Sequence, residues 1–229
     1  MASSTVEDYL KQLYLEQRGH PGELTLMGRL AAAMRVAPGT ATAMVKGLSE
    51  SGQVEYEPRG GVRLTPSGER LALHVLRRHR LLELFLVKVL GLDWSVVHEE
   101  AETLEHALSD RVLDRLDALL GHPSVDPHGD PIPTPRGQLA EPRRISSADC
   151  PVGVSLRIAR VVDQDPAFLQ FLERQSLRPG STVTVAHREA AADAVRIRTR
   201  RRQEVSLGLA AAAKVLVEAS TAARKSRDV

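Results

Sequence analysis

Apolar residues recur at helical spacing in the first part of the chain and predict three short helices. The first covers residues 4–17, where four residues share one side, Val6, Leu10, Leu13 and Tyr14. Two more helices are expected near residues 24–34 and 40–51. Residues 53–57 and 62–65 then alternate between apolar and polar around a Pro-Arg-Gly-Gly turn, which predicts a β-hairpin. Three helices followed by a basic-tipped hairpin are typical of a winged helix-turn-helix, whose third helix enters the major groove of DNA.

Longer helices are expected after the hairpin. A helix that starts at Pro66 should run to about residue 90, because proline suits the first turn and Gly91 can end the helix. Further helices are expected over residues 95–108 and 109–120. Long apolar helices outside the winged module indicate a dimer interface.

The composition changes at residues 121–151, where seven of the thirteen prolines lie. This segment is expected to be an extended linker with little regular structure. Beyond it, alternating apolar positions predict a small β-barrel with one short helix. The strands are expected at residues 154–162, 182–187, 194–199 and 204–207, and the helix at residues 166–174. Residues after about Ser220 are expected to be frayed.

At 229 residues the chain is long enough to bury a core and to form more than one domain. Its 42% apolar and 26% charged residues are ordinary for a globular protein. The single cysteine, Cys150, cannot close an intrachain disulfide, which fits a reducing cytosol. No apolar run reaches ~18 residues and the first residues do not form a signal peptide, so we expect a cytoplasmic protein without a membrane partner.

Histidines and carboxylates gather between residues 79 and 106. His79 and Glu83 are one helical turn apart. Four more such residues fall within a sector of roughly 100° on the next expected helix, and they are His98, Glu102, Glu105 and His106. Side chains of these types beside a buried face either pair with one another or bind a cation. Their number favours a cation, and a simple helix ion pair is the alternative for His79 and Glu83.

The third expected helix and the hairpin carry residues suited to DNA. Small and hydroxyl-bearing residues at the start of the helix admit close approach to base edges, and basic residues reach phosphates. The residues assigned to DNA contact are Ala37, Pro38, Gly39, Thr40, Thr42, Lys46 and, at the hairpin tip, Arg59. Three arginines at residues 200–202 could form a second nucleic-acid patch, but a solvated turn between strands fits them better.

The run RRHRLLELFLVKVLGLDWSVVHEEAETLEHALSDRVLDRL, together with VEDYLKQLY and HGDPIP, resembles the metal-dependent repressors typified by the diphtheria toxin repressor and the manganese transport regulator. The resemblance covers nearly the whole chain and is most specific in residues 77–133. It implies a homodimer that binds a palindromic operator in double-stranded DNA. Such proteins repress metal-uptake genes when Mn(II) or Fe(II) is plentiful.

The resemblance also implies a mainly α fold with α+β elements. A winged helix-turn-helix DNA-binding domain is expected at residues 1–73 and a helical dimerisation and metal-binding domain at residues 74–140. A linker at residues 141–152 would lead to an SH3-like (FeoA-type) β-barrel at residues 153–229.

Metal ligands are carried over from the same resemblance. The primary site maps to Asp8, Glu102, Glu105 and His106. A second site maps to His79, Glu83 and His98, with further ligands at Asp126, His128 and Asp163. Lys11 stands where some manganese-type relatives carry a metal-binding glutamate, which argues against a close pair of ions. Glu102 stands where iron-type relatives carry cysteine.

The donors are mostly carboxylate oxygens with imidazole and no thiolate. This set suits Mn(II), tolerates Fe(II), and leaves Co(II) or Zn(II) as substitutes in vitro. Residues 98–102 approach a zinc-protease signature, but Glu102 stands in place of its second histidine, so no enzyme is expected. The alternatives to a Mn(II)-activated repressor are an Fe(II)-dependent repressor of iron-uptake genes and a winged-helix regulator with a non-metal effector.

Overall fold

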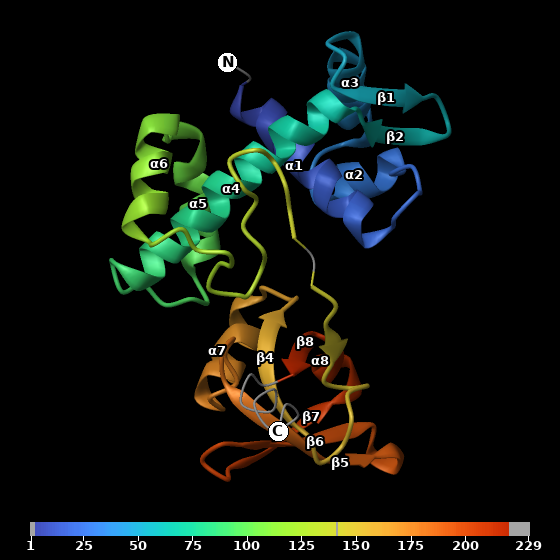
Figure 1. Ribbon diagram of the computed structural model, residues 1–229. Helices are drawn as coiled ribbons and strands as arrows, with labels where there is room; N and C mark the ends of the chain where they lie inside the picture. The colour runs from blue at the N-terminus through green and yellow to red at the C-terminus, as the bar shows by residue number, and fades with distance from the viewer. Residues whose placement is uncertain (1–2, 141, 220–229) are drawn as a thin grey trace, which may run out of the picture. The chain divides into compact units, whose positions relative to one another are not determined.

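The computed structural model in Figure 1 describes residues 3–140 and 142–219. The chain forms two compact units, which we describe separately. The first consists of residues 1–79, 103–114 and 133–139, and the second of residues 80–102, 115–132 and 140–229. The expectation of fraying after Ser220 concerns a segment that lies outside the described residues.

The first unit opens with three helices and a hairpin, as the apolar pattern predicts. These are α1 (Ser4–Gly19), α2 (Met27–Ala33), α3 (Pro38–Glu50), β1 (Val54–Glu57) and β2 (Gly61–Leu64). The Ser3 hydroxyl caps α1 by accepting the N–H of Val6 at 3.4 Å. α2 is shorter than expected, because Thr25 forms a bridge to Val62 beside the hairpin instead of joining the helix. α3 starts two residues earlier than expected, at Pro38, which suits the first helical turn.

One core joins the helices of the winged module to the first half of α4 (Pro66–Lys88). Leu10 and Leu13 on α1 and Val45 on α3 are fully buried in it. Ala72 and Leu76, on the first half of α4, belong to the same apolar cluster. Since protein cores are close-packed, a displacement of α1 cannot leave α3 unaffected.

The expectation of a single α-helix over residues 95–108 is wrong, because the α-helix in this region is shorter. α5 (Val97–Leu104) ends where a 3-10 turn, η1 (Glu105–Ala107), begins, and α6 (Asp110–Leu119) follows separately. Leu108 is extended, and the Ser109 hydroxyl accepts the N–H of Val112 at 3.4 Å at the start of α6. Glu102 and His106 therefore do not share one continuous α-helix, because Glu102 lies in α5 and His106 in the 3-10 turn.

The described residues between 120 and 144 contain no helix or strand, as expected, but residues 124–132 form a closed turn instead of an extended linker. The N–H of Asp126 donates to the carbonyl of Asp130 at 2.9 Å, and the N–H of Ile132 donates to Ser124 at 2.9 Å. Four side chains of this stretch are buried, those of Asp126, His128, Asp130 and Ile132. Composition alone could not predict this, because prolines are compatible with a closed turn as well as with an extended chain.

The second unit contains the small β-barrel that the sequence predicts (Figure 1). Its antiparallel sheet has six strands in the order β3-β8-β4-β5-β6-β7. The elements are β3 (Ile145–Ser146), β4 (Ser155–Val161), α7 (Pro166–Arg174), β5 (Thr182–Glu189), η2 (Ala190–Ala192), β6 (Ala194–Thr199), β7 (Glu204–Gly208), α8 (Leu209–Ala213) and β8 (Val215–Ala219). β3, α8 and β8 were not expected from the sequence, although β8 pairs directly with β4.

The barrel residues surround the main core of the second unit. Ile158, Ile197 and Leu172 are fully buried there, and Trp94 belongs to the same cluster. Among the described residues, no helix has both the length and the apolar character that crossing a bilayer requires.

Candidate metal centres and DNA-binding surface

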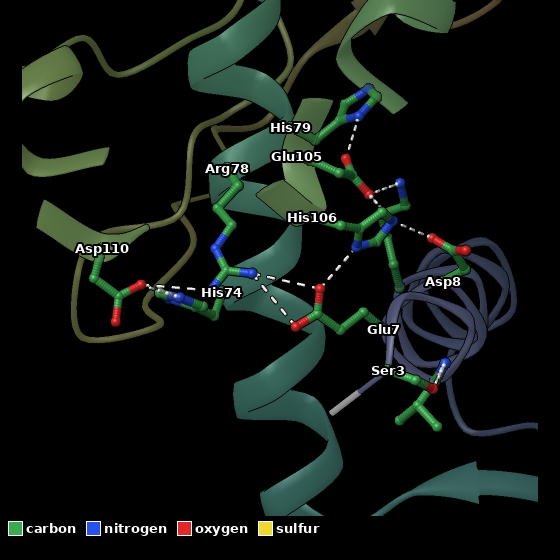
Figure 2. A network of polar contacts seen from close by, with 11 residues as sticks. Ser3, Glu7, Asp8, His74, Arg78, His79, Glu105, His106 and Asp110 are labelled. Carbon is green, nitrogen blue, oxygen red and sulfur yellow. Dashed lines mark hydrogen bonds and ion pairs between the residues drawn. The ribbon is translucent and has the colours of Figure 1, made fainter. Parts of the chain in front are cut away.

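Three of the expected ligands converge in the first unit. Asp8 comes from α1, and Glu105 and His106 come from η1 (Figure 2). Nε2 of His106 lies 2.9 Å from Oδ1 of Asp8 and 3.5 Å from Oε1 of Glu105. One ligand atom from each residue lies within 4.8 Å of the other two, so all three could bind one ion. We call this group the first centre.

Glu105 is completely buried and is held from two sides. Nζ of Lys11 donates to its Oε1 at 2.6 Å, and Nδ1 of His79 lies 2.7 Å from its Oε2. A buried carboxylate needs such partners, because its desolvation would otherwise outweigh the contacts it makes. His79, which the resemblance assigned to the second site, therefore contacts a residue of the first centre.

His106 is oriented by a residue that the sequence analysis did not single out. Nδ1 of His106 lies 2.8 Å from Oε2 of Glu7, and Glu7 is also 3.4 Å from Nη1 of Arg78 (Figure 2). With Nδ1 facing Glu7, the other ring nitrogen faces Asp8 and Glu105. Burial lowers the pKa of His106, but the three surrounding carboxylates outweigh that effect and raise it overall. The only sequence signal for Glu7 was its position beside Asp8.

A second group of possible ligands lies in the second unit, and we call it the second centre. It consists of Glu83 on α4 with Asp126 and His128 from the proline-rich segment. All three are buried, with exposed fractions of 0, 4 and 0%. Nδ1 of His128 lies 3.6 Å from Oε2 of Glu83, and the ligand atoms of the three residues lie within 4.8 Å of one another.

The second centre contains polar atoms without hydrogen-bond partners among the described residues. Nδ1 of His128 and Oδ2 of Asp126 are buried and form no hydrogen bond. The opposite nitrogen of His128, Nε2, donates to the carbonyl of Trp94 at 2.8 Å, which directs Nδ1 towards the carboxylates. Buried polar atoms without a hydrogen bond lower the stability of the folded state. A divalent cation would give both atoms a partner, because it binds carboxylate oxygen and imidazole nitrogen together.

The pKa values of the second centre are shifted by its burial and its charges. Burial opposes the charged form of His128, but Glu83 and Asp126 outweigh it and raise the pKa of the imidazole to about 9. Burial together with the charges of Asp130 and Glu83 raises the pKa of Asp126 well above its usual value. The centre thus holds protons that a bound cation would displace.

Of the remaining expected ligands, His98 contacts a residue of the second centre, whereas Asp163 lies outside both centres. Nδ1 of His98 lies 3.4 Å from Oε1 of Glu83, and its Nε2 lies 3.8 Å from Oε1 of Glu102 on the same helix. The structure places Asp163 outside the second centre, where Nζ of Lys214 donates to it at 2.5 Å. That hydrogen bond is the main reason why the pKa of Asp163 is lowered.

The expected DNA-contact residues gather at the start of α3 and at the hairpin turn. Six of them are exposed, namely Ala37, Pro38, Gly39, Thr40, Lys46 and Arg59. The opposite side of α3 is buried, including Ala41, Val45 and Leu48. The Thr42 hydroxyl donates to the carbonyl of Pro38 at 2.8 Å, so its oxygen can only accept from another group. α3 therefore presents to solvent one side that carries small residues, Thr40 and Lys46.

Three family models match the chain. The model described as "Iron dependent repressor, N-terminal DNA binding domain" matches residues 1–62. The model of the metal binding and dimerisation domain of iron dependent repressors matches residues 65–134, and the FeoA domain matches residues 148–219.

Individual proteins resemble the chain over most of their length. The diphtheria toxin repressor of Corynebacterium efficiens is 32% identical over 196 residues, which cover 81% of this chain and 84% of that protein. The HTH-type transcriptional regulator MntR of Lysinibacillus sphaericus is 33% identical, over 55% of this chain and 91% of that protein. A solved structure titled "Manganese-dependent transcriptional repressor complex with manganese" has a TM-score of 0.84 and 38% identity, covering 94% of this chain and all of that one.

Proposed function

The chain belongs to the iron-dependent repressor family of metal-dependent transcriptional regulators, and we propose that it is a Mn(II)-activated homodimeric repressor. It would bind a palindromic operator and control genes of metal uptake and homeostasis. The observation that carries the metal dependence is the second centre, whose buried Nδ1 of His128 and Oδ2 of Asp126 form no hydrogen bond within the described residues. The family is one of DNA-binding repressors and not of enzymes.

The donor set favours Mn(II) as the effector. Each centre offers two carboxylates and one imidazole, which suit a hard to borderline divalent ion. Thiolate is absent from both centres, and the thiol of Cys150 is buried beside the carbonyl of Ser147. A related solved structure contains manganese, which agrees with this choice. An Fe(II)-activated repressor is the alternative, since Fe(II) accepts the same donors, and Co(II) or Zn(II) should substitute in vitro.

The first centre connects metal binding to the winged module. A bound divalent cation would supply positive charge to the carboxylates of Asp8 and Glu105. Asp8 lies on α1, whereas Glu105 and His106 lie on η1, so the ligands tie these two elements together. α1 shares its core with the DNA-facing helix α3, and the position of α3 therefore depends on how α1 is held.

In a homodimer, this coupling would set the separation of two α3 helices. Two recognition helices bind one operator only when their spacing matches successive major grooves, roughly 34–36 Å apart. We infer that the ligands favour the competent spacing by shifting an existing equilibrium. Glu102 would assist from α5, and the contact residues of α3 and Arg59 would meet the DNA.

The test is operator binding as a function of free metal. A duplex selected from random sequence by the Mn(II)-loaded protein is titrated with the protein in chelator, Mn(II), Fe(II) and Zn(II), and fluorescence anisotropy gives the affinity. We expect tight binding only with metal, and its loss in His106→Ala and His128→Ala. His122→Ala is the matched control, because His122 is exposed, pairs with Asp117 and belongs to neither ligand group. Equal affinity in chelator and in Mn(II) would remove metal activation and favour a non-metal effector.

A further inference from the structure

Two ligands of the second centre belong to a tight loop, residues 126–131, which we call the ligand loop. Oδ1 of Asp126 accepts the N–H groups of His128 at 2.8 Å and Asp130 at 2.9 Å, so this oxygen holds the loop closed. Its other oxygen, Oδ2, faces the centre, forms no hydrogen bond and lies 3.7 Å from Nε of Arg80. The geometry of Asp126 and His128 therefore depends on whatever keeps the whole loop in place.

Strand β4 of the barrel supports the ligand loop through the backbone. The N–H of Val161 donates to the carbonyl of His128 at 2.9 Å. Gly129 has a φ of +85°, and a Cβ at this position would lie 2.0 Å from the carbonyl oxygen of Ala159. Loop and strand thus approach so closely that only glycine fits between them.

An ion-pair bridge, in which Asp130 and Arg80 are buried and Arg160 is partly exposed, joins the loop to both neighbouring elements. Asp130 is 3% exposed, and its Oδ1 lies 2.6 Å from Nη2 of Arg160 on β4 and 3.4 Å from Nη2 of Arg80 on α4. Arg80 also donates to the carbonyl of Pro131 at 2.5 Å. A β-bulge between Ile158 and Arg160 interrupts the register of β4, and bulges commonly redirect a side chain.

The bridge depends on both of its arginines. Removing Arg160 leaves the buried carboxylate of Asp130 with only the longer contact to Arg80, which is unfavourable for a buried charge. Loss of Arg160 would therefore push Asp130 towards water and open the loop at the end that carries His128. Arg160 itself is not among the ligand residues, so it would act through Asp130 and the loop.

We propose that Arg160 and Asp130 are positioning residues of the second centre, so that the C-terminal barrel sets the metal affinity of this site through the ligand loop. This inference rests on the proposed metal function of Glu83, Asp126 and His128. It assigns the barrel a defined task in metal sensing, namely to hold the ligand loop in the shape that binds the ion.

The experiment measures each centre separately. In a His106→Ala background the first centre is disabled, and Mn(II) affinity is measured by calorimetry and by the loss of the free Mn(II) paramagnetic resonance signal. Arg160→Gln should weaken this affinity by about tenfold or more, as is usual for residues that orient metal ligands. Arg160→Lys should restore part of it. Arg157→Gln is the matched control on the same strand, because Arg157 pairs with Glu218 instead.

A second parent variant distinguishes an effect of Arg160 on the ligand loop from a general loss of stability. In His128→Ala, where only the first centre remains, Arg160→Gln should leave the Mn(II) affinity unchanged. In the metal-free full chain, Arg160→Gln should increase acrylamide quenching of Trp94, the only tryptophan, because its carbonyl accepts from His128.

The outcomes distinguish the inference from the function on which it rests. If Arg160→Gln leaves the Mn(II) affinity of the His106→Ala background unchanged, the positioning role alone is overturned. An equal loss in both backgrounds overturns it as well, since it indicates general destabilisation. Absence of Mn(II) binding by His106→Ala with Arg160 intact overturns the second centre itself, and the positioning role with it.

Discussion

Nζ of Lys11 lies 2.6 Å from Oε1 of Glu105, and the two side chains are only 7 and 0% exposed. The ammonium group therefore supplies a positive charge to a carboxylate that we propose as a metal ligand. Nδ1 of His79 contacts the other oxygen of Glu105 at 2.7 Å. The metal-free first centre is thus stabilised from within, and any bound cation has to share Glu105 with these two groups.

Replacing Lys11 by glutamine should destabilise the metal-free protein and increase its response to metal. Loss of the ammonium leaves Glu105 buried with one partner fewer, which costs about 3 kcal/mol. The free energy of unfolding in chelator should fall by about that amount, and added Mn(II) should recover more of it than in the wild type. Chemical denaturation with and without Mn(II) measures both. Lys88→Gln, an exposed lysine, is the control, and unaltered stability of Lys11→Gln in chelator would contradict the prediction.

Replacing Glu7 by alanine should weaken metal binding at the first centre by about tenfold, the usual effect of losing a group that orients a ligand histidine. Glu7 holds Nδ1 of His106 at 2.8 Å, so its loss frees the ring to rotate. Calorimetry with Mn(II) in the His128→Ala background measures this centre alone. Glu16→Ala on the same helix, where Glu16 pairs with Arg29, should bind like its parent. If both variants bind like the parent, the orienting role is refuted.

Lys46 and Arg59 should contribute to DNA affinity mainly through phosphates. Each substitution by alanine should weaken binding to all duplexes alike and reduce the slope of log affinity against log salt by about one. Anisotropy titrations in Mn(II) at several salt concentrations give that slope. Arg201→Ala, in the turn after β6, should leave it unaltered. A salt slope that does not change in Lys46→Ala would exclude a phosphate contact for this residue.

The metal-free protein should lose stability as the pH rises from neutral to alkaline. The pKa of His128 is about 9 in the folded chain, against an ordinary value of 6.5. Folding therefore favours the protonated imidazole. This stabilisation is complete at a pH below the pKa of the unfolded chain, and it is lost as the pH rises through the pKa of the folded chain. Thermal unfolding in chelator should show a decrease in Tm of roughly 5–10 °C over this range. His122→Gln should show the same profile, whereas a Tm that is flat or rising in the wild type would contradict the shift.

Local features of the sequence determined much of the secondary structure. The helix over residues 166–174 and the strand over residues 194–199 occur in the structure with the expected bounds. The winged module also follows its apolar periodicity, because the spacing of apolar residues close together in the sequence determines which face of a short helix or hairpin is buried. The types of side chain suited to a metal were visible for the same reason, since a histidine and a glutamate one turn apart are neighbours in sequence.

Only the tertiary structure decided which of these side chains meet. Lys11 contacts Glu105, and Glu7 contacts His106, across more than ninety residues of chain. The ligand loop is ordered because β4 and α4 supply its backbone and charge partners, and a proline-rich composition carries no information about them. Periodicity specifies which face of an element is buried. The pairing of charges depends instead on how elements distant in sequence pack together, and this packing exists only in the folded protein.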